Sequence, residues 1–580
     1  MIVQGQQRDT LQTATITGTL LRAHDSPTSS DSLLLQNSTA ANYLIKDARY
    51  QIRQYAPGSV ITSNFGGANS SQSTILWDGI DLSSAASGVL DLSLVPAIML
   101  QQNSLIEGSS AGSVGVNGMA GALNLSFDVS GKREFSTLLN TDNIGGFGIG
   151  VVNGGHFGKV KYKSYLNSVQ SENAYPYSLG GIGHTMEGMS YSQLTFMQKY
   201  AGKYKRSNWS TDIWYTSSEK YNRGSVLSSS LPSLLEDEVL RAKYTWQKRR
   251  HKLTVMGARE WQSYTDTLGS LEVLDTNSYE QLTAQYRFVH QKRNTAVDWS
   301  YFNAGGTSRD AQNVLITLRH QEVLNANWRV NARLGSFLGK VYPAGQVLWQ
   351  KQKNQRSIQW SLGSFYRLPT LNELYWQPGG NEALRPERSY GAKWSISGQW
   401  KEWDYTFSAD QLIVDNLIQW LPLAGTVWSP QNFKRVFLST QNLQLSRRFG
   451  AVHSVSSLNQ QYTRVMAVEQ GVATIEIGKA LIYRPTFQAV ETVEYRWEDA
   501  AIQLRAHAVG SRHTLRDNHP SGELGPEFWM DLTYVQTYFN GLLQSSVGIQ
   551  NITNSERTYF PYFPMPGRFL TVNLKLSSKK

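Results

Sequence analysis

Residues 72–96 read QSTILWDGIDLSSAASGVLDLSLVP and contain a short apolar run on either side of one tight turn. The first run ends at Trp77, Asp78 and Gly79 follow it, and the second run begins at Ile80. An Asp-Gly pair between apolar runs is a strong hairpin signal, because glycine accepts the positive φ that such a turn demands. The sequence therefore predicts a β-hairpin with its turn at Asp78-Gly79.

The length and hydropathy of the chain limit its fold. At 580 residues it exceeds one ordinary soluble core, so we expect several domains or one very large closed sheet. No apolar run of about 18 residues or more occurs, which excludes a helical membrane protein. A transmembrane β-barrel is permitted, because its strands alternate lipid-facing apolar with lumen-facing polar residues and average to mild hydropathy. The mean hydropathy of the chain is -0.38.

Aromatic residues make up 11% of the chain, with 29 Tyr and 17 Trp. Tyr and Trp favour the boundary between hydrocarbon and water, so this composition favours the aromatic girdles of a barrel, although a large soluble propeller could share it. The chain has no Cys, which excludes disulfides, thiolate metal sites and thiol nucleophiles. The net charge is +11, but the densest basic cluster, residues 248–252, lies between two alternating segments and indicates a solvated turn instead of a nucleic-acid site.

From about residue 129 onward the sequence alternates in the manner of β-strands. Residues 240–246 and 253–257 form one predicted hairpin, and residues 394–400 and 403–409 form another, each around a short polar turn. Longer polar stretches begin at Ser171, and short turns on one side with long loops on the other are typical of outer-membrane barrels. Dividing this part by roughly 20 residues per strand and connection predicts about 22 strands.

The N-terminal part resembles the plug domain of TonB-dependent outer-membrane receptors. In that family a "vl-(D/N)-G-ipl... dlslIP" segment is similar to residues 72–96, and a "G-x-x-G-a-l/i-N-i" segment is similar to the Gly-rich end of residues 25–128. The residues that match the plug motifs are Trp77, Asp78, Gly79, Gly118, Gly121 and Asn124. The family's usual Arg-Gly pair ahead of the hairpin is replaced here by NFGG at residues 64–67.

Residues 11–19, LQTATITGT, resemble the energy-coupling box "l-x-e-V-V-V-T-G-T" of the Bacteroidetes-like branch of these receptors. Such a box adds an extended strand to the sheet edge of the periplasmic domain of TonB. The residues assigned to the TonB box are Leu11, Gln12, Thr13, Ala14, Thr15, Ile16 and Thr17.

Three later segments resemble barrel motifs of the same family. They are FYRLPTLNELYWQPGGNEALRPE at 365–387, DNLIQWLPLAGTVWSPQNFKRV at 415–436, and GIQNITNSERTYFPYFPMPGRFLTVNLKL at 548–576. Together with the plug they cover most of the chain in the family's order.

The resemblance implies an all-β membrane protein with an N-terminal leader at residues 1–24, a globular α+β plug at 25–128 and a transmembrane antiparallel β-barrel at 129–580. It also implies a place in the outer membrane and active, TonB-driven uptake of a scarce nutrient. Size and motifs resemble the cobalamin receptors most closely, and siderophore, haem or another metal chelate is the alternative. The implied partners are TonB, the nutrient, outer-membrane lipid and a surface lipoprotein, with no nucleic acid.

The aromatic residues that we expect at loop bases as ligand contacts are Tyr175, Tyr177, Tyr375 and Trp376, for which girdle anchoring is the alternative role. No metalloprotease helix, Walker loop or nucleophile elbow occurs, so the sequence predicts neither an enzyme nor a cofactor. Asp78 and Asp81 are too few carboxylates for a calcium site, and we expect no bound metal. Two functions of another class stay open, a non-transporting adhesin or docking barrel and a soluble all-β binding protein.

Overall fold

The computed structural model describes residues 38–84, 87–101, 104–107, 118–179, 181–227, 231–268, 271–306, 311–376, 379–422, 428–468 and 474–578. Among these residues no helix has both the length and the apolar character needed to cross a membrane.

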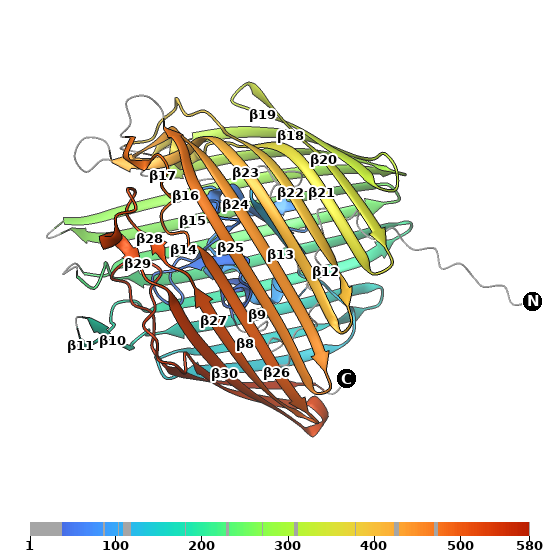
Figure 1. Ribbon diagram of the computed structural model, residues 1–580. Helices are drawn as coiled ribbons and strands as arrows, with labels where there is room; N and C mark the ends of the chain where they lie inside the picture. The colour runs from blue at the N-terminus through green and yellow to red at the C-terminus, as the bar shows by residue number, and fades with distance from the viewer. Residues whose placement is uncertain are drawn as a thin grey trace, which may run out of the picture.

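The described strands form one closed antiparallel barrel of 22 strands (Figure 1), as the sequence predicted. Its first half consists of β7 (Glu134–Asp142), β8 (Phe147–Phe157), β9 (Val160–Ser171), β12 (Tyr191–Tyr204), β13 (Ser207–Asn222), β14 (Ser233–Lys248), β15 (His251–Leu268), β16 (Leu271–His290), β17 (Arg293–Gly306), β18 (Ala311–Val323) and β19 (Trp328–Phe337). Its second half consists of β20 (Lys340–Lys353), β21 (Arg356–Arg367), β22 (Glu387–Trp400), β23 (Trp403–Pro422), β24 (Trp428–Phe449), β25 (Val452–Val468), β26 (Phe487–Trp497), β27 (Ala500–Val509), β30 (Glu527–Tyr538), β31 (Leu543–Gln550) and β32 (Phe569–Ser577).

The last strand closes the sheet on the first. β32 pairs antiparallel with β7, from Thr571↔Asp142 to Ser577↔Ser136. Both predicted hairpins are present, β14 with β15 and β22 with β23. Because the backbone groups of β7 and β32 bond to each other, the sheet has no edge at this seam.

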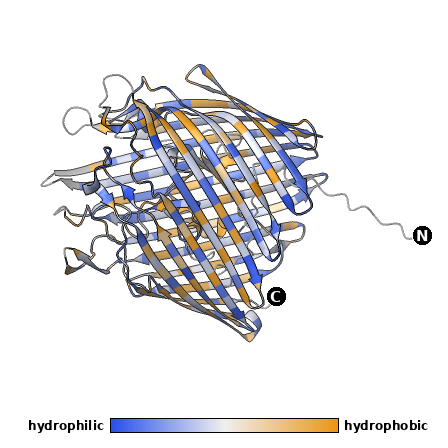
Figure 2. Cartoon of the chain, in the orientation of Figure 1, coloured by the Kyte–Doolittle hydropathy of each residue, from blue (hydrophilic) through white to orange (hydrophobic). Residues whose placement is uncertain are grey.

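Hydrophilic and hydrophobic residues alternate along the strands of the barrel wall (Figure 2). On β14, Val239, Arg241 and Lys243 are buried toward the lumen, whereas the alternating residues Leu240 and Tyr244 are exposed on the outside. An apolar outer face with a polar inner face is what a strand between lipid and a filled lumen requires.

The two ends of the barrel differ in their connections. At one end the strands are joined by tight turns, such as Arg249-Arg250 between β14 and β15. At the other end the connections are longer and hold the small hairpins β10 (Pro176–Leu179) with β11 (Ile182–Thr185) and β28 (Arg512–His513) with β29 (Glu523–Leu524), drawn at the left of Figure 1. By the rule for outer-membrane barrels, the tight turns face the periplasm and the long loops face outward.

The described residues 38–128, called the N-terminal unit below, lie inside the barrel (Figure 1). They form helix α2 (Ala40–Leu44), the pair β1 (Tyr50–Arg53) and β2 (Thr62–Phe65), and a sheet of order β4-β3-β6-β5. The strands of that sheet are β3 (Ser73–Trp77), β4 (Ile80–Asp81), β5 (Ser104–Glu107) and β6 (Gly121–Leu125), and the 3-10 helices are η1 (Ser70–Gln72), η2 (Leu92–Leu94) and η3 (Ala97–Leu100).

The core of the N-terminal unit continues into the barrel wall. Trp77 and Leu92 of the unit share one buried apolar cluster with Tyr165, Met197 and Trp214 of the wall. The unit therefore fills the lumen along this wall. The domain limits at residues 24 and 128 stay predictions, and the first barrel strand begins at Glu134.

The Asp-Gly hairpin forms as predicted. β3 and β4 pair antiparallel through Trp77↔Ile80. Asp78 has φ 49° and Gly79 has φ 91°, so both turn residues adopt the left-handed backbone of a two-residue hairpin turn. On its other edge β3 pairs in parallel with β6, from Ser73↔Gly121 to Trp77↔Leu125.

We expect an outward charge at mid-strand to destabilise the barrel. Leu240→Arg should cost about 2–4 kcal/mol of folding free energy in lipid vesicles, because the guanidinium would sit near the bilayer centre. Tyr204→Arg, at the end of β12 beside a tight turn, should cost about 0–1 kcal/mol and serves as the matched control. Urea denaturation in vesicles measures both, and equal costs would contradict the placement of the outer face in lipid.

Candidate functional site

The candidate site is the contact between the N-terminal unit and the barrel wall. The predicted TonB box, Leu11–Thr17, lies outside the described residues, so its assignment stays a prediction. The predicted plug-motif residues are described, and the structure brings several of them together.

Lys199, Asp212, Lys243 and Asp78, called the lysine clamp below, join the hairpin turn to the wall. Lys243 Nζ donates to Asp78 Oδ2 at 2.6 Å. Asp212 on β13 lies 3.8 Å from Lys243 Nζ and 3.2 Å from Lys199 Nζ. The side chains of Lys243 and Asp212 are about 1% exposed and that of Asp78 is 25% exposed, so the clamp is buried on the side of the wall and each charge has an opposite partner.

The aromatic residue of the turn packs on the same wall. Lys243 Nζ lies 3.7 Å from the ring centroid of Trp77, in cation–π contact. The Trp77 and Trp214 rings meet edge to face at 5.6 Å, and the Arg241 guanidinium lies 4.8 Å over Trp214. The turn is therefore fixed both by charge and by ring packing.

The charge state of Asp78 is set by burial and by the neighbouring lysines. Burial would raise the pKa of its carboxyl, but the ammonium groups of Lys243 and Lys199 outweigh burial and hold the pKa well below its ordinary value of 3.8. Asp78 is thus a carboxylate at neutral pH. In Asp81, by contrast, burial dominates and raises the pKa.

The Gly-rich end of the unit supports the turn from the other side. Asn124 Oδ1 accepts a hydrogen bond from the Gly79 backbone N–H at 2.8 Å. A Cβ at Gly121 would lie 2.8 Å from the Phe65 Cβ, so only glycine fits there. Gly118 is buried directly before these residues. Asn124 therefore positions the hairpin turn, and Gly121 allows β6 to pack closely on Phe65.

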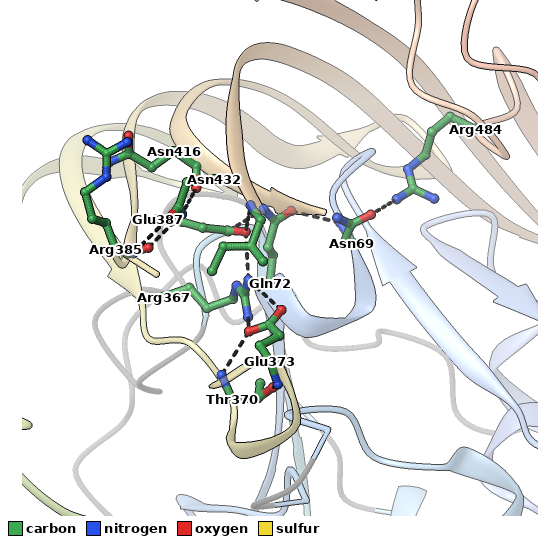
Figure 3. Close-up of polar contacts among 11 residues, drawn as sticks. Asn69, Gln72, Arg367, Thr370, Glu373, Arg385, Glu387, Asn416, Asn432 and Arg484 are labelled. Carbon is green, nitrogen blue, oxygen red and sulfur yellow. Dashed lines mark hydrogen bonds and ion pairs between the residues drawn. The ribbon is translucent and has the colours of Figure 1, made fainter. Parts of the chain in front are cut away.

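A second contact lies at the outer end of the barrel (Figure 3). Gln72 Nε2 donates to Glu387 Oε2 at 2.7 Å, and Arg367 donates to Glu387 at 2.8 Å and to Glu373 at 3.0 Å. Arg367 and Glu387 are fully buried. Thr370 and Glu373 form a capping box at the start of α3 (Leu371–Tyr375), which holds Glu373 in place.

Arg484, in the connection after β25, extends this outer contact. Its Nη2 donates to Asn69 Oδ1 at 2.5 Å (Figure 3). Its Nε donates to the Gly67 carbonyl oxygen at 2.8 Å. Asn69 in turn bonds through its backbone N–H to Gln72 Oε1 at 2.9 Å. Groups of the barrel wall thus hold the N-terminal unit both on the side of the tight turns and at the outer end.

The predicted ligand-contact residues lie in separate clusters. Tyr175 is 1% exposed, donates from its hydroxyl to the Pro564 carbonyl oxygen at 3.0 Å, and packs with Met186 and Met189. Tyr177, two residues on, is half-buried and stacks on His184 at 5.4 Å.

Tyr375 and Trp376 end the short helix α3 and are half-buried. Tyr375 packs against the buried cluster that contains Tyr366 and Leu374, and Tyr175 belongs to a different cluster. The structure therefore does not bring the four aromatic residues into one site, and their role in ligand contact stays a prediction. No group of three His, Asp or Glu side chains suited to a metal ion occurs within the described ranges.

The closed 22-strand barrel with a unit inside its lumen is similar in fold to outer-membrane receptors of the TonB-dependent class. No protein-family model matches the chain. The vitamin B12 transporter BtuB of Vibrio vulnificus is 19% identical over 435 residues, which cover 70% of this chain and 69% of that protein. BtuB of Photobacterium profundum is 27% identical over 167 residues, and this match covers 28% of the chain but only 26% of that transporter.

Solved structures share the fold over nearly the whole chain. The siderophore receptor PirA from Acinetobacter baumannii superposes with a TM-score of 0.73 at 10% identity, over 93% of this chain and 96% of its own. The FrpB iron transporter from Neisseria meningitidis gives 0.76 at 11% identity, over 95% and 98%. The copper transporter OprC gives 0.76 at 13% identity, over 94% and 96%. The predicted resemblance in fold is thereby confirmed.

Sequence reasoning missed the wall residues of both contacts. Asp212 on β13 and Lys243 on β14 alternate along their strands with residues that face outward. This alternation is the sequence signal that indicates a lumen-facing side chain. Arg367 and Glu387 lie in the segment at 365–387 that resembles a barrel motif of the family, but the resemblance assigns no role to either charged side chain.

A double-mutant cycle tests the lysine clamp. Lys243→Met should lower the docking stability of the N-terminal unit by about 1–3 kcal/mol, because it leaves the partly buried Asp78 carboxylate without its closest cation. Adding Asp78→Asn should restore much of this loss. Hydrogen exchange of β3 and β6 measures docking, and purely additive effects of the two substitutions would contradict the pairing.

The depressed pKa of Asp78 sets a pH dependence. Its stabilising contribution is complete above the ordinary Asp pKa of 3.8 and is lost as the pH falls below that value. We expect exchange protection of β3 to fall more steeply in this acid range in the unmodified protein than in Asp78→Asn. Parallel pH profiles would show that Asp78 does not carry this dependence.

Proposed function

We propose that the protein is a TonB-driven importer that carries a scarce nutrient, with cobalamin favoured, across the outer membrane. The names of the sequence relatives support this choice, since both are vitamin B12 transporters. The partners would be the periplasmic domain of TonB and a small-molecule nutrient. The relatives are named as transporters and receptors, which agrees with a protein that is not an enzyme.

The observation that carries the proposal is the attachment of the lumen-filling unit to several parts of the wall. Asp78 binds Lys243 on β14 near the tight turns, and Gln72 binds Glu387 on β22 near the outer loops. A unit held in this way blocks passage until work is done on it. An extended peptide at Leu11–Thr17 that adds to a sheet edge of TonB would be the point at which that work is applied.

Metal-chelate uptake is the second candidate. It is favoured by the names of the solved structures with this fold, which include a siderophore receptor, an iron transporter and a copper transporter. The contact residues we propose for either nutrient are Tyr177, Tyr375 and Trp376, which are half-buried at the outer end. Tyr175 could contribute only after its loop opens, because it is buried.

Deletion of residues 11–19 tests the transport function. We expect uptake of the cognate nutrient to fall to background while its binding at the cell surface is retained, because the deletion removes only the coupling segment. Labelled cobalamin, haem and ferric siderophores form the panel, measured for binding and for uptake.

A variant with a Gly-Ser segment of the same length in place of residues 11–19 controls for spacing and should behave like the deletion. Uptake that survives in both variants would contradict energised transport, and binding without uptake in the unmodified protein as well would favour a non-transporting adhesin or docking barrel. Uptake of cobalamin alone would identify it as the substrate, and uptake of a metal chelate alone would support the second candidate.

A further inference from the structure

The basic segment between β14 and β15 divides between solvent and the lumen. Lys248, Arg249 and Arg250 are exposed at the tight turn. Lys252, the second residue of β15, shares a face of that strand with Met256, which packs in the core of the N-terminal unit. The first three cations therefore belong to a solvated turn, whereas the Lys252 side chain faces the lumen.

Lys252 meets a second cation on the next strand. In the register of β15 and β16 it stands directly opposite Arg287, and the two residues are called the cation pair below. Like charges in this position destabilise a sheet. Arg287 is 6% exposed, and among the described residues its Nε has no hydrogen-bond partner. A buried guanidinium in this state has lost water without gaining an acceptor, which is costly.

The carboxylates nearest to the cation pair are bound to other cations. Asp298 accepts from Arg319 Nε at 2.7 Å and from Arg319 Nη2 at 2.8 Å. Asp78 accepts from Lys243 Nζ at 2.6 Å. In the part of the chain that the structure describes, neither member of the cation pair forms an ion pair with a carboxylate.

The cation pair lies beside the hairpin turn of the N-terminal unit. A Cβ at Gly79 would lie 3.7 Å from Arg287 Nη2. Gln285, on the same face of β16, donates to the Gly79 carbonyl oxygen at 3.4 Å. Lys252 interacts electrostatically with Asp78 and with further cations, which include Lys243. The wall beside the docked turn thus carries positive charge that no described carboxylate balances.

We propose that Lys252 and Arg287 bind a small oxyanion of the phosphate type, which braces the docked hairpin turn. The Arg287 guanidinium presents N–H donors in a fixed fork, and Lys252 adds a point charge. The fork alone would occupy both oxygens of a carboxylate, whereas a phosphate keeps further oxygens for Lys252.

The site is reached from the periplasmic end of the lumen. Lys252 is half-buried and stands directly after the tight turn, so an anion in the periplasm has access to it. The bilayer lies on the opposite face of the wall, so the anion comes from solution and not from a lipid headgroup. The site is independent of the nutrient and of TonB.

Phosphate binding to the purified full-length chain tests the site. Inorganic phosphate is titrated by calorimetry into the protein in a non-ionic detergent, with chloride holding the ionic strength constant. We expect Lys252→Gln/Arg287→Gln to weaken phosphate binding about tenfold or more, because charge-assisted hydrogen bonds from both side chains are lost. Acetate that binds the unmodified protein more tightly than phosphate would overturn the assignment to a phosphate-type anion.

Lys248→Gln/Arg250→Gln is the matched control. It removes the same charge at the same end of the barrel, but from exposed side chains. We expect phosphate affinity to stay within about twofold, because salt screens exposed charges. Equal weakening by both double variants would show an effect of net charge alone and would overturn the site. Unaltered hydrogen exchange at the seam of β7 and β32 verifies that each variant keeps the barrel.

Hydrogen exchange of β3 and β6 measures the bracing of the turn. Phosphate should slow this exchange in the unmodified protein and not in the Lys252→Gln/Arg287→Gln variant, since a ligand of the docked state stabilises that state. Phosphate binding without slower exchange would overturn the bracing. If the unmodified protein binds no phosphate, the site is wrong and the proposed import function is untouched, because neither measurement involves nutrient or TonB.

Discussion

Closure of the sheet between β7 and β32 is the constraint on which the rest of the structure depends. In lipid no water can bond to an open strand edge, so each backbone group needs a partner within the wall. A closed sheet of 22 strands encloses a lumen too wide for its own side chains to fill. The N-terminal unit occupies that space, and its buried surface meets a polar wall because the apolar faces of the strands are turned to lipid.

The chemistry of the contact follows from that polar wall. Lysines at inward positions of β13 and β14, Lys220 and Lys243, meet Asp91 and Asp78 of the unit. Buried ion pairs contribute little net stability after desolvation, but breaking one partner away is costly. Such pairs fix the orientation of the unit without making its docking very strong, which is what release of the unit under the proposed import function would require.

The sequence predicted the wall well because each strand carries its own period-two pattern, and Asp78-Gly79 specifies its turn without help from distant residues. The contacts of the turn could not be predicted in this way. Lys243 lies 165 residues from Asp78, and the two meet only through the curvature and register of the closed sheet. Tyr175 shows the same limit, since its burial against Met186 and Met189 is decided by how the outer loops fold back, which local pattern does not encode.

The parallel pairing of β3 with β6 has a mechanical consequence. A force along the chain from the N-terminal side would load the pairs from Ser73↔Gly121 to Trp77↔Leu125 along the strand axis, so that their hydrogen bonds would have to break together. β4 is held to β3 through two residue pairs across a hairpin and would peel one bond at a time. The central pair β3–β6 therefore resists a pulling force better than the edge pair β3–β4. The same force can displace β4 while β3 and β6 stay paired.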